Sequence, residues 1–302
     1  MTKKLIFYGA ADMQDCMMNK YNKESNSVLA IIVSFNGGVQ LRETATALID
    51  QVESLLIVDN GSNESTLQVI RELEVELNIH TIFFGENIGI AGALNHGVKL
   101  AQDQGFQWIL TMDQDSVAQP EMVSEMLATS SKFNNSPMVT PSIFSRVFDR
   151  VNGDVKVVYA ITSGNLVPIS VYSRIGLYKT DYFIDSVDFE FCLRAHNAGI
   201  KLIRSSKAFL QHQLGVAIVK SFLNFKWTYI EHKPIRRYYI YRNHFYLTAE
   251  YLQSNPYFII KKSLVLIFYT LELIIFDTQR VENIIMILRG LNHYLKGKTG
   301  SF

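Results

Sequence analysis

Three short runs decide the fold: VLAIIVSF (residues 28–35), LLIVDNGS (55–62) and WILTMDQDS (108–116). Each run begins with apolar residues that predict a buried strand, and a polar cluster follows. A further strand is predicted at residues 80–84. Helical patterns lie between the strands, at residues 39–51, 65–77 and 91–103. This alternation predicts an α/β fold whose mostly parallel sheet is covered on both faces. Such sheets bind ligands beyond the carboxyl ends of their strands, so we expect the polar clusters to share one site.

The sequence changes character after Pro120. Helices are predicted there over 121–132 and 185–198, and short strands over 139–141, 155–159 and 201–204. From Phe222 onward the sequence is aromatic, basic and mostly helical in pattern. We therefore predict three parts: a flexible leader (1–27), an α/β domain (28–220, with halves 28–116 and 117–220) and a helical C-terminal region (221–302).

Charge is distributed unevenly along the chain. The 302 residues carry a net charge of +1, yet residues 200–302 hold 15 Lys and Arg against 5 Asp and Glu. A near-neutral total argues against nucleic acid as a partner, whereas the basic and aromatic end indicates a task of its own. The two cysteines, Cys16 and Cys192, cannot form a disulfide framework, which indicates a reducing compartment.

No signal peptide is recognisable in residues 1–27, and no run reaches the ~18–20 apolar residues of a transmembrane helix. The nearest to one is Ser263–Phe276, which contains Glu272 and has basic residues on both sides: Lys261, Lys262, Arg280, Arg289, Lys296 and Lys298. Two interpretations stay open, a buried C-terminal helix and a helix lying in the membrane interface. We expect a cytoplasmic protein, and under the second interpretation one that is peripheral on the inner face of the cytoplasmic membrane.

Several polar residues are candidates for chemistry. Asp113 and Asp115 follow a predicted strand, where they either form a solvated turn or hold Mg²⁺ or Mn²⁺ through carboxylate oxygens. His212 is either structural or a third ligand of that metal. Asp59 is either a turn residue or an acceptor for a nucleobase N–H. The residues Asn87, Gly89, Asn95 and Gly97 either form ordinary turns and helix or let the backbone approach a ligand.

Two further groups lie in the second half of the sequence. Asp188 is either the third residue of a helix capped by Asp185 or a general base that faces a cleft. The guanidinium groups of Arg236, Arg237 and Arg242 suit a diphosphate, and a solvated helix face is the alternative. No G-x-G-x-x-G follows a strand and no G-x-x-x-x-G-K-[ST] occurs, which argues against NAD enzymes and P-loop NTPases.

Taken together, the motifs resemble those of family 2 glycosyltransferases with the GT-A fold, and among these the bacterial rhamnosyltransferases. The resemblance runs in order through AIIVSFN (30–36), LLIVDNGS (55–62), ENIGIAGALNHGV (86–98), WILTMDQDS (108–116), ITSGNLV (161–167), YFIDSVDFEFCLRAHNAG (182–199), QHQLG (211–215) and RRYYIYRNHF (236–245).

The resemblance implies a role for each matching residue. Ser34, Asn36 and Asp59 would contact the base and ribose, and Asn87, Gly89 and Asn95 would line the nucleotide-sugar site. Asp113 would lie near the ribose, and the metal would be held by Asp115 with Asp113 and His212. Asp188 would be the catalytic base, although Val187 stands where the family has a Glu. Three arginines would bind the diphosphate or a lipid-linked acceptor: Arg236, Arg237 and Arg242.

The activity that the resemblance implies is inverting transfer of a sugar from a nucleotide-sugar. The donor would be dTDP-β-L-rhamnose, and the acceptor a glycan or a polyprenyl-diphosphate-linked sugar of O-antigen, lipopolysaccharide or capsule. The half 28–116 would then bind the nucleotide and the half 117–220 the acceptor. Two alternatives stay open: a sugar nucleotidyltransferase, and a non-catalytic membrane-associated partner of a polysaccharide assembly complex. A homodimer also stays open.

Overall fold

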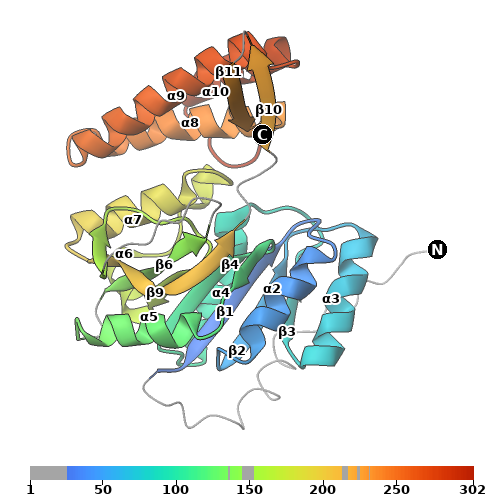
Figure 1. Ribbon diagram of the computed structural model, residues 1–302, viewed down its shortest axis with the longest axis vertical. Helices are drawn as coiled ribbons and strands as arrows, with labels where there is room; N and C mark the ends of the chain where they lie inside the picture. The colour runs from blue at the N-terminus through green and yellow to red at the C-terminus, as the bar shows by residue number, and fades with distance from the viewer. Residues whose placement is uncertain (1–25, 135–136, 145–152, 213–216, 223–224, 231) are drawn as a thin grey trace.

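The computed structural model describes residues 26–134, 137–144, 153–212, 217–222, 225–230 and 232–302. Almost all of the predicted leader, together with Cys16, lies outside these ranges. Figure 1 shows a sheet flanked by helices and, above it, a layer made by the C-terminal helices.

The first half of the sheet is parallel, as predicted. The strand β1 (Val28–Ser34) lies between β2 (Ser54–Asp59) and β4 (Trp108–Asp113), and β3 (His80–Phe83) pairs with β2 at the edge. Alternate side chains of β1 enter two different cores, one on each face, which explains its uninterrupted apolar sequence. Because the chain returns from β3 to the far side of β1, strand order reverses between β1 and β4, and open sheets bind ligands at such a point.

The second half of the sheet is mixed. The strand β8 (Asn165–Pro168) is antiparallel to β4, and β6 (Met138–Phe144), β9 (Leu202–His212) and β5 (Ser116–Ala118) extend the sheet beyond it. The short β7 (Val155–Val157) pairs with β9. The predicted strand 201–204 is therefore much longer, and its extension places His212 directly opposite Ser116.

Helices cover the two faces of the sheet separately. One core contains apolar residues of α2 (Gln40–Ile49), α3 (Glu64–Leu77) and α5 (Met122–Ser131). The other contains those of α4 (Ile90–Asp103), α6 (Ile169–Ile175) and α7 (Val187–Asn197), with the single turn η1 (Thr180–Tyr182) before α7. These elements confirm the expected mixed, mostly parallel α/β sheet between helices.

The C-terminal region consists of α8 (Pro234–Tyr251), α9 (Pro256–Phe276) and α10 (Arg280–Leu295), preceded by a hairpin of β10 (Ala217–Phe222) and β11 (Phe225–Ile230). Residues 225–230 were expected to be helical, so that expectation was wrong. The predicted boundary at residue 220 also falls inside β10, because the hairpin pairs residue by residue across it. In Figure 1 the hairpin stands at one end of the helical layer.

The surface of α9 is mostly apolar and only partly covered. Four of its residues are buried, including Leu266 and Leu273, but large apolar side chains along the rest of it are exposed: Tyr257, Ile260, Leu264, Val265, Ile267, Phe268, Tyr269, Leu271, Ile274 and Ile275. The expectation of a buried helix is therefore met on one side of α9 only, and the membrane-interface interpretation stays a prediction. Within the described ranges, every helix falls short of the length and apolarity needed to cross a bilayer.

Arg242 joins the C-terminal region to the loop before α7. It is fully buried, and its guanidinium donates to the carbonyl oxygens of Gly300 (2.7 Å), Asp181 (3.2 Å) and Tyr182 (3.2 Å). The N–H of Gly300 donates in turn to the Asp181 carbonyl (2.8 Å), and that of Phe302 to the Tyr239 hydroxyl (2.7 Å). Arg242 therefore stabilises the packing of the C-terminal region. It does not line the pocket, so the expected contact with a diphosphate was wrong.

Candidate active site

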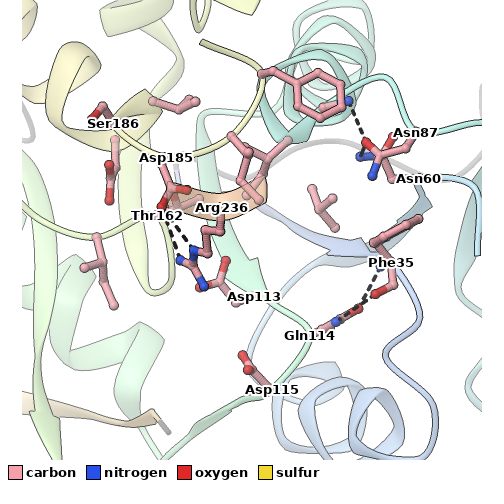
Figure 2. Close-up of a pocket in the computed structure, with 18 of the residues that line it drawn as sticks. Phe35, Asn60, Asn87, Asp113, Gln114, Asp115, Thr162, Asp185, Ser186 and Arg236 are labelled. Atoms are coloured by element: carbon pink, nitrogen blue, oxygen red, sulfur yellow. Dashed lines mark hydrogen bonds and ion pairs between the residues drawn. The ribbon is translucent and has the colours of Figure 1, made fainter. Parts of the chain in front are cut away.

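A pocket of about 650 Å³ lies beyond the carboxyl ends of β1 and β4. Its wall includes Phe35 after β1, the turn Asp113–Asp115 after β4, and the segment Phe183–Phe189 that leads into α7. Asp113, Asp115 and Asp188 therefore border one cavity, and the two that follow β4 lie where an open α/β sheet binds ligands. Figure 2 shows the labelled carboxylates and amides converging on it.

The Asp113–Asp115 turn is fixed from both sides. Gln114 forms a pair of hydrogen bonds with the backbone of Phe35, accepting from its N–H (2.7 Å) and donating to its carbonyl (3.2 Å). The Ser163 hydroxyl accepts from the Asp113 N–H (3.1 Å). Such contacts hold a carboxylate-bearing turn in one conformation. Gln114 stands within the predicted motif, but nothing in the sequence indicated that its side chain would reach across to β1.

Asp113, Asp115 and His212 form a possible metal site. Their ligand atoms all lie within 4.8 Å of one another. His212 shares a 2.7 Å hydrogen bond between its Nδ1 and the Ser116 hydroxyl, which leaves Nε2 to face a ligand. Two carboxylates and an imidazole are a ligand set that Mg²⁺ or Mn²⁺ accepts, so the residues fit the expected cofactor.

The electrostatics of these groups agree with a cation site. Burial, reinforced by the carboxylates of Asp115 and Asp188, raises the pKa of Asp113 to about 7 against the opposing effect of Arg236. Burial lowers the pKa of His212, although the Asp115 carboxylate acts in the opposite direction. His212 is thus neutral near pH 7, the form in which imidazole binds metals.

Asp188 lies in the first turn of α7 and faces the pocket. Burial raises the pKa of Asp188 to about 6, against the effects of the Lys262 ammonium and of the Phe189 N–H, which donates to Asp188 Oδ1 at 2.8 Å. Lys262 comes from α9, and its Nζ lies 3.7 Å from the centre of the Phe189 ring. A carboxylate with a pKa near the working pH can both accept and hold a proton, as a general base must.

The expected cap of α7 was wrong. Ser186 rather than Asp185 occupies the N-cap position, without a side-chain cap bond, and both residues have positive φ (65° and 61°). Asp185 instead pairs with Arg236 (3.3 Å), and both line the pocket. Burial raises the pKa of Asp185, while Arg236, Lys262 and Arg237 oppose that effect. Sequence reasoning did not predict this ion pair. It also did not assign His232, which lines the pocket as well.

A second polar cluster lies at the end of β2. Asp59 is buried, and its Oδ2 accepts from the N–H groups of Gly61 and Ser62, both at 3.1 Å. Its Oδ1 and the Ser34 hydroxyl have no hydrogen-bond partner among the described residues, although both are buried. Such atoms are candidates for a ligand's N–H or O–H groups. The expected contact Asn36 is exposed and accepts from the Asn63 N–H at 2.8 Å.

Two amide side chains of the pocket wall, Asn60 after β2 and Asn87 in the loop before α4, contact each other. Asn60, which sequence reasoning missed as a site residue, donates to Asn87 (3.1 Å) and accepts from the Ile88 N–H (2.9 Å). Gly89 has φ 82°, and an added Cβ would lie 2.7 Å from Phe183. Glycine is therefore required where this loop passes the segment leading to α7.

Six expected site residues do not line the pocket: Ser34, Asn36, Asp59, Asn95, Arg237 and Arg242. Asn95 is buried and forms two hydrogen bonds with the backbone of Tyr178, at 2.8 and 2.9 Å, so it fixes α4 to the α6–α7 connection. Arg237 is also buried, inside the packing of α8, and of the three arginines only Arg236 is at the pocket.

Comparison with known proteins gives the class of this site. Residues 29–153 match the family model described as glycosyl transferase family 2. The dTDP-rhamnosyl transferase RfbF of Shigella flexneri is 28% identical over 245 residues, which are 74% of this chain and 80% of that protein. An uncharacterized glycosyltransferase of Rickettsia typhi is 24% identical over 123 residues, 40% of this chain and 37% of that protein.

Solved structures agree at the level of the fold. TarS 1–349 of S. aureus in complex with UDP has a TM-score of 0.54 and 14% identity, covering 89% of this chain and 72% of that one. The longer TarS chain has a TM-score of 0.52 and 13% identity, and the match spans 90% of this chain but only 44% of TarS. Over residues 29–153 the chain therefore resembles family 2 glycosyltransferases, and its fold is that of the TarS structures. The similarity to a dTDP-rhamnosyl transferase favours sugar transfer over nucleotidyl transfer.

Proposed function

We propose that this chain acts as a family 2 glycosyltransferase, which moves a sugar from a nucleoside diphosphate to an acceptor hydroxyl with inversion at the anomeric carbon. The observation that carries the proposal is the common pocket of Asp188 and the Asp113–Asp115 turn. A candidate base and a candidate diphosphate site lie on different walls of one cavity. This arrangement suits attack on one side of a sugar and departure from the other.

In the proposed reaction Asp188 accepts the proton of the acceptor hydroxyl as the oxygen attacks the anomeric carbon. The bond from that carbon to the diphosphate oxygen breaks on the opposite side, and the nucleoside diphosphate leaves with the electron pair. Arg236, exposed at the rim and paired with Asp185, is placed to donate to the leaving diphosphate. A divalent cation bound by Asp113, Asp115 and His212 would neutralise the charge that grows on the diphosphate.

The unpartnered oxygens of Asp59 and Ser34 are assigned to the nucleoside. Asp59 Oδ1 would accept an N–H of the base, and the Ser34 hydroxyl lies one strand away in register with it. We propose L-rhamnose as the sugar and dTDP-β-L-rhamnose as the donor, on the grounds of similarity to the Shigella dTDP-rhamnosyl transferase. The product would be an α-L-rhamnoside of a cell-surface polysaccharide.

A thermal-shift panel with Mn²⁺ tests the donor. It compares dTDP-β-L-rhamnose, UDP-glucose, UDP-galactose and GDP-mannose. A donor at 100 times its Kd stabilises the folded protein by ~2.7 kcal/mol, which in a chain of this size raises Tm by several degrees. We expect the largest rise with dTDP-β-L-rhamnose. A larger rise with another donor would contradict the choice of sugar, and no rise with any of them would contradict the proposed function.

We also propose that the exposed apolar face of α9 lies on the membrane that carries the acceptor. Basic residues accompany this face along α9 and α10, among them Lys261, Arg280 and Arg289. Apolar side chains with flanking cations are typical of helices that lie in the interface of an anionic bilayer.

Flotation with vesicles tests this orientation. The protein is expected to float with anionic vesicles and much less with zwitterionic ones. Ile267→Glu, on the exposed face of α9, should lower the floated fraction severalfold, whereas Val75→Glu, at an exposed valine of α3, should not. If the protein forms dimers and stays in the bottom fraction, the exposed face of α9 contacts a second copy of the chain, and the membrane proposal is contradicted.

A further inference from the structure

A second cavity, of about 360 Å³, adjoins the active-site pocket. Ile161 lines both cavities, so the two have one wall in common. Behind that wall three aromatic rings contact one another: Tyr159 lies 5.4 Å from Phe189 and 5.3 Å from Phe258. Phe189 directly follows Asp188, so a molecule in the second cavity lies one side chain away from the proposed base.

The lining of this second cavity, which we call the α9 groove, combines two chemistries. Most of it is apolar or aromatic: Pro141, Ile143, Val157, Val158, Tyr159, Tyr257 and Phe258. Two cations, Arg204 from β9 and Lys261 from α9, complete it. Among the described residues neither forms an ion pair or side-chain hydrogen bond, although Arg204 is partly buried.

Arg204 is partly buried and Lys261 exposed, so both cations are available to an anionic ligand whose apolar part would contact the rest of the lining. A guanidinium and an ammonium together suit the oxygens of a diphosphate. Isoprene units would cover Val158, Tyr159 and Tyr257, which are 38%, 46% and 80% exposed, and would continue along the exposed apolar face of α9. A neutral glycan would leave both cations unpaired.

We infer that the α9 groove binds the diphosphate and first isoprene units of a lipid-linked acceptor, with the phosphates on Arg204 and Lys261. This inference rests on the proposed function and deepens it, because it chooses the lipid-linked acceptor over a free glycan. The acceptor sugar, attached to the diphosphate, then extends past Ile161 into the pocket that contains Asp188.

The test is a calorimetric titration of the full chain with farnesyl diphosphate, after the donor pocket has been saturated with dTDP and Mn²⁺. Saturation prevents the probe's diphosphate from occupying the donor site. We expect farnesyl diphosphate to bind at least ~10-fold more tightly than either farnesol or inorganic pyrophosphate, because the groove recognises both parts. Equal affinity for pyrophosphate would reduce the groove to a simple anion site and overturn the inference.

Three variants complete the experiment. Arg204→Gln with Lys261→Gln should weaken farnesyl diphosphate at least ~10-fold, and Val158→Trp, which fills the groove, should weaken it without removing a charge. Lys207→Gln, at an exposed lysine of the same strand β9 as Arg204, should leave the affinity unchanged. Unaltered affinity in the first two variants would overturn the inference. The initial dTDP titration reports separately on the proposed function, because it does not involve the groove.

Discussion

Replacing Asp188 by Asn is expected to lower the rate of sugar transfer by about 10²–10⁴-fold, the contribution that general-base catalysis typically makes. The amide keeps an oxygen that can accept the 2.8 Å hydrogen bond from the Phe189 N–H, so the start of α7 should keep its conformation. What disappears is the ability to take a proton from the acceptor. The affinity for a nucleoside diphosphate in the presence of Mn²⁺, measured by titration, should remain within about threefold of that of the wild type.

The pH dependence of the wild type gives an independent measurement. Because burial raises the pKa of Asp188 to about 6, its carboxylate is lost as the pH falls through 6, and the transfer rate should fall with it. Removing the ammonium with Lys262→Met takes away a group that lowers this pKa, so the acidic limb should move to higher pH. Asp103→Asn, at an exposed carboxylate of α4, is the matched control. Full activity in Asp188→Asn would remove this residue from the mechanism.

Replacing Asp115 by Asn is expected to abolish most of the metal-dependent affinity for nucleoside diphosphates. Loss of a partner that only orients a ligand typically costs 10–100-fold in metal affinity, and loss of the ligand itself should cost at least as much. His212→Gln should behave similarly. Ser116→Ala, which removes only the 2.7 Å contact to His212 Nδ1, should lose about tenfold.

Titrations with Mn²⁺ and with a chelator separate the two parts of nucleotide affinity. The wild type should bind much more tightly with Mn²⁺, and the Asp115 variant should bind about equally weakly under both conditions. His96→Gln, at an exposed histidine of α4, is the histidine control. A wild-type affinity that does not respond to Mn²⁺ would contradict the assignment of this cluster as a metal site.

The parallel first half of the sheet could be predicted closely from sequence. Strands β1, β2 and β4 are buried on both faces, so their apolar runs are continuous and stand out from the helical patterns around them. Ligands of open sheets bind at the carboxyl ends of the strands. From this rule and the strand order, the position of Asp113 and Asp115 at the pocket could be predicted. Asp188 could be brought there only by the resemblance, because nothing local fixes how α7 packs on the sheet.

The errors lie where a side chain's partner is distant in sequence. Arg237 and Arg242 look like surface cations beside tyrosines. The guanidinium of Arg242, however, donates hydrogen bonds to backbone carbonyls about 60 residues away. Asn95 resembles a ligand contact but bonds the Tyr178 backbone, 83 positions along the chain. The hairpin β10–β11 was missed although β-branched and aromatic residues, which favour strands, make up most of its sequences AIVKSF and FKWTYI.

The hydrogen bonds around Gly300 have a consequence for the order in which the protein matures. The loop before α7, which contributes Phe183 to the pocket, is tied to Gly300 both directly and through Arg242. During synthesis the nucleotide-binding strands leave the ribosome long before these residues are translated. The part of the pocket wall that contains Phe183 therefore takes its final position only after residue 300 has been synthesised.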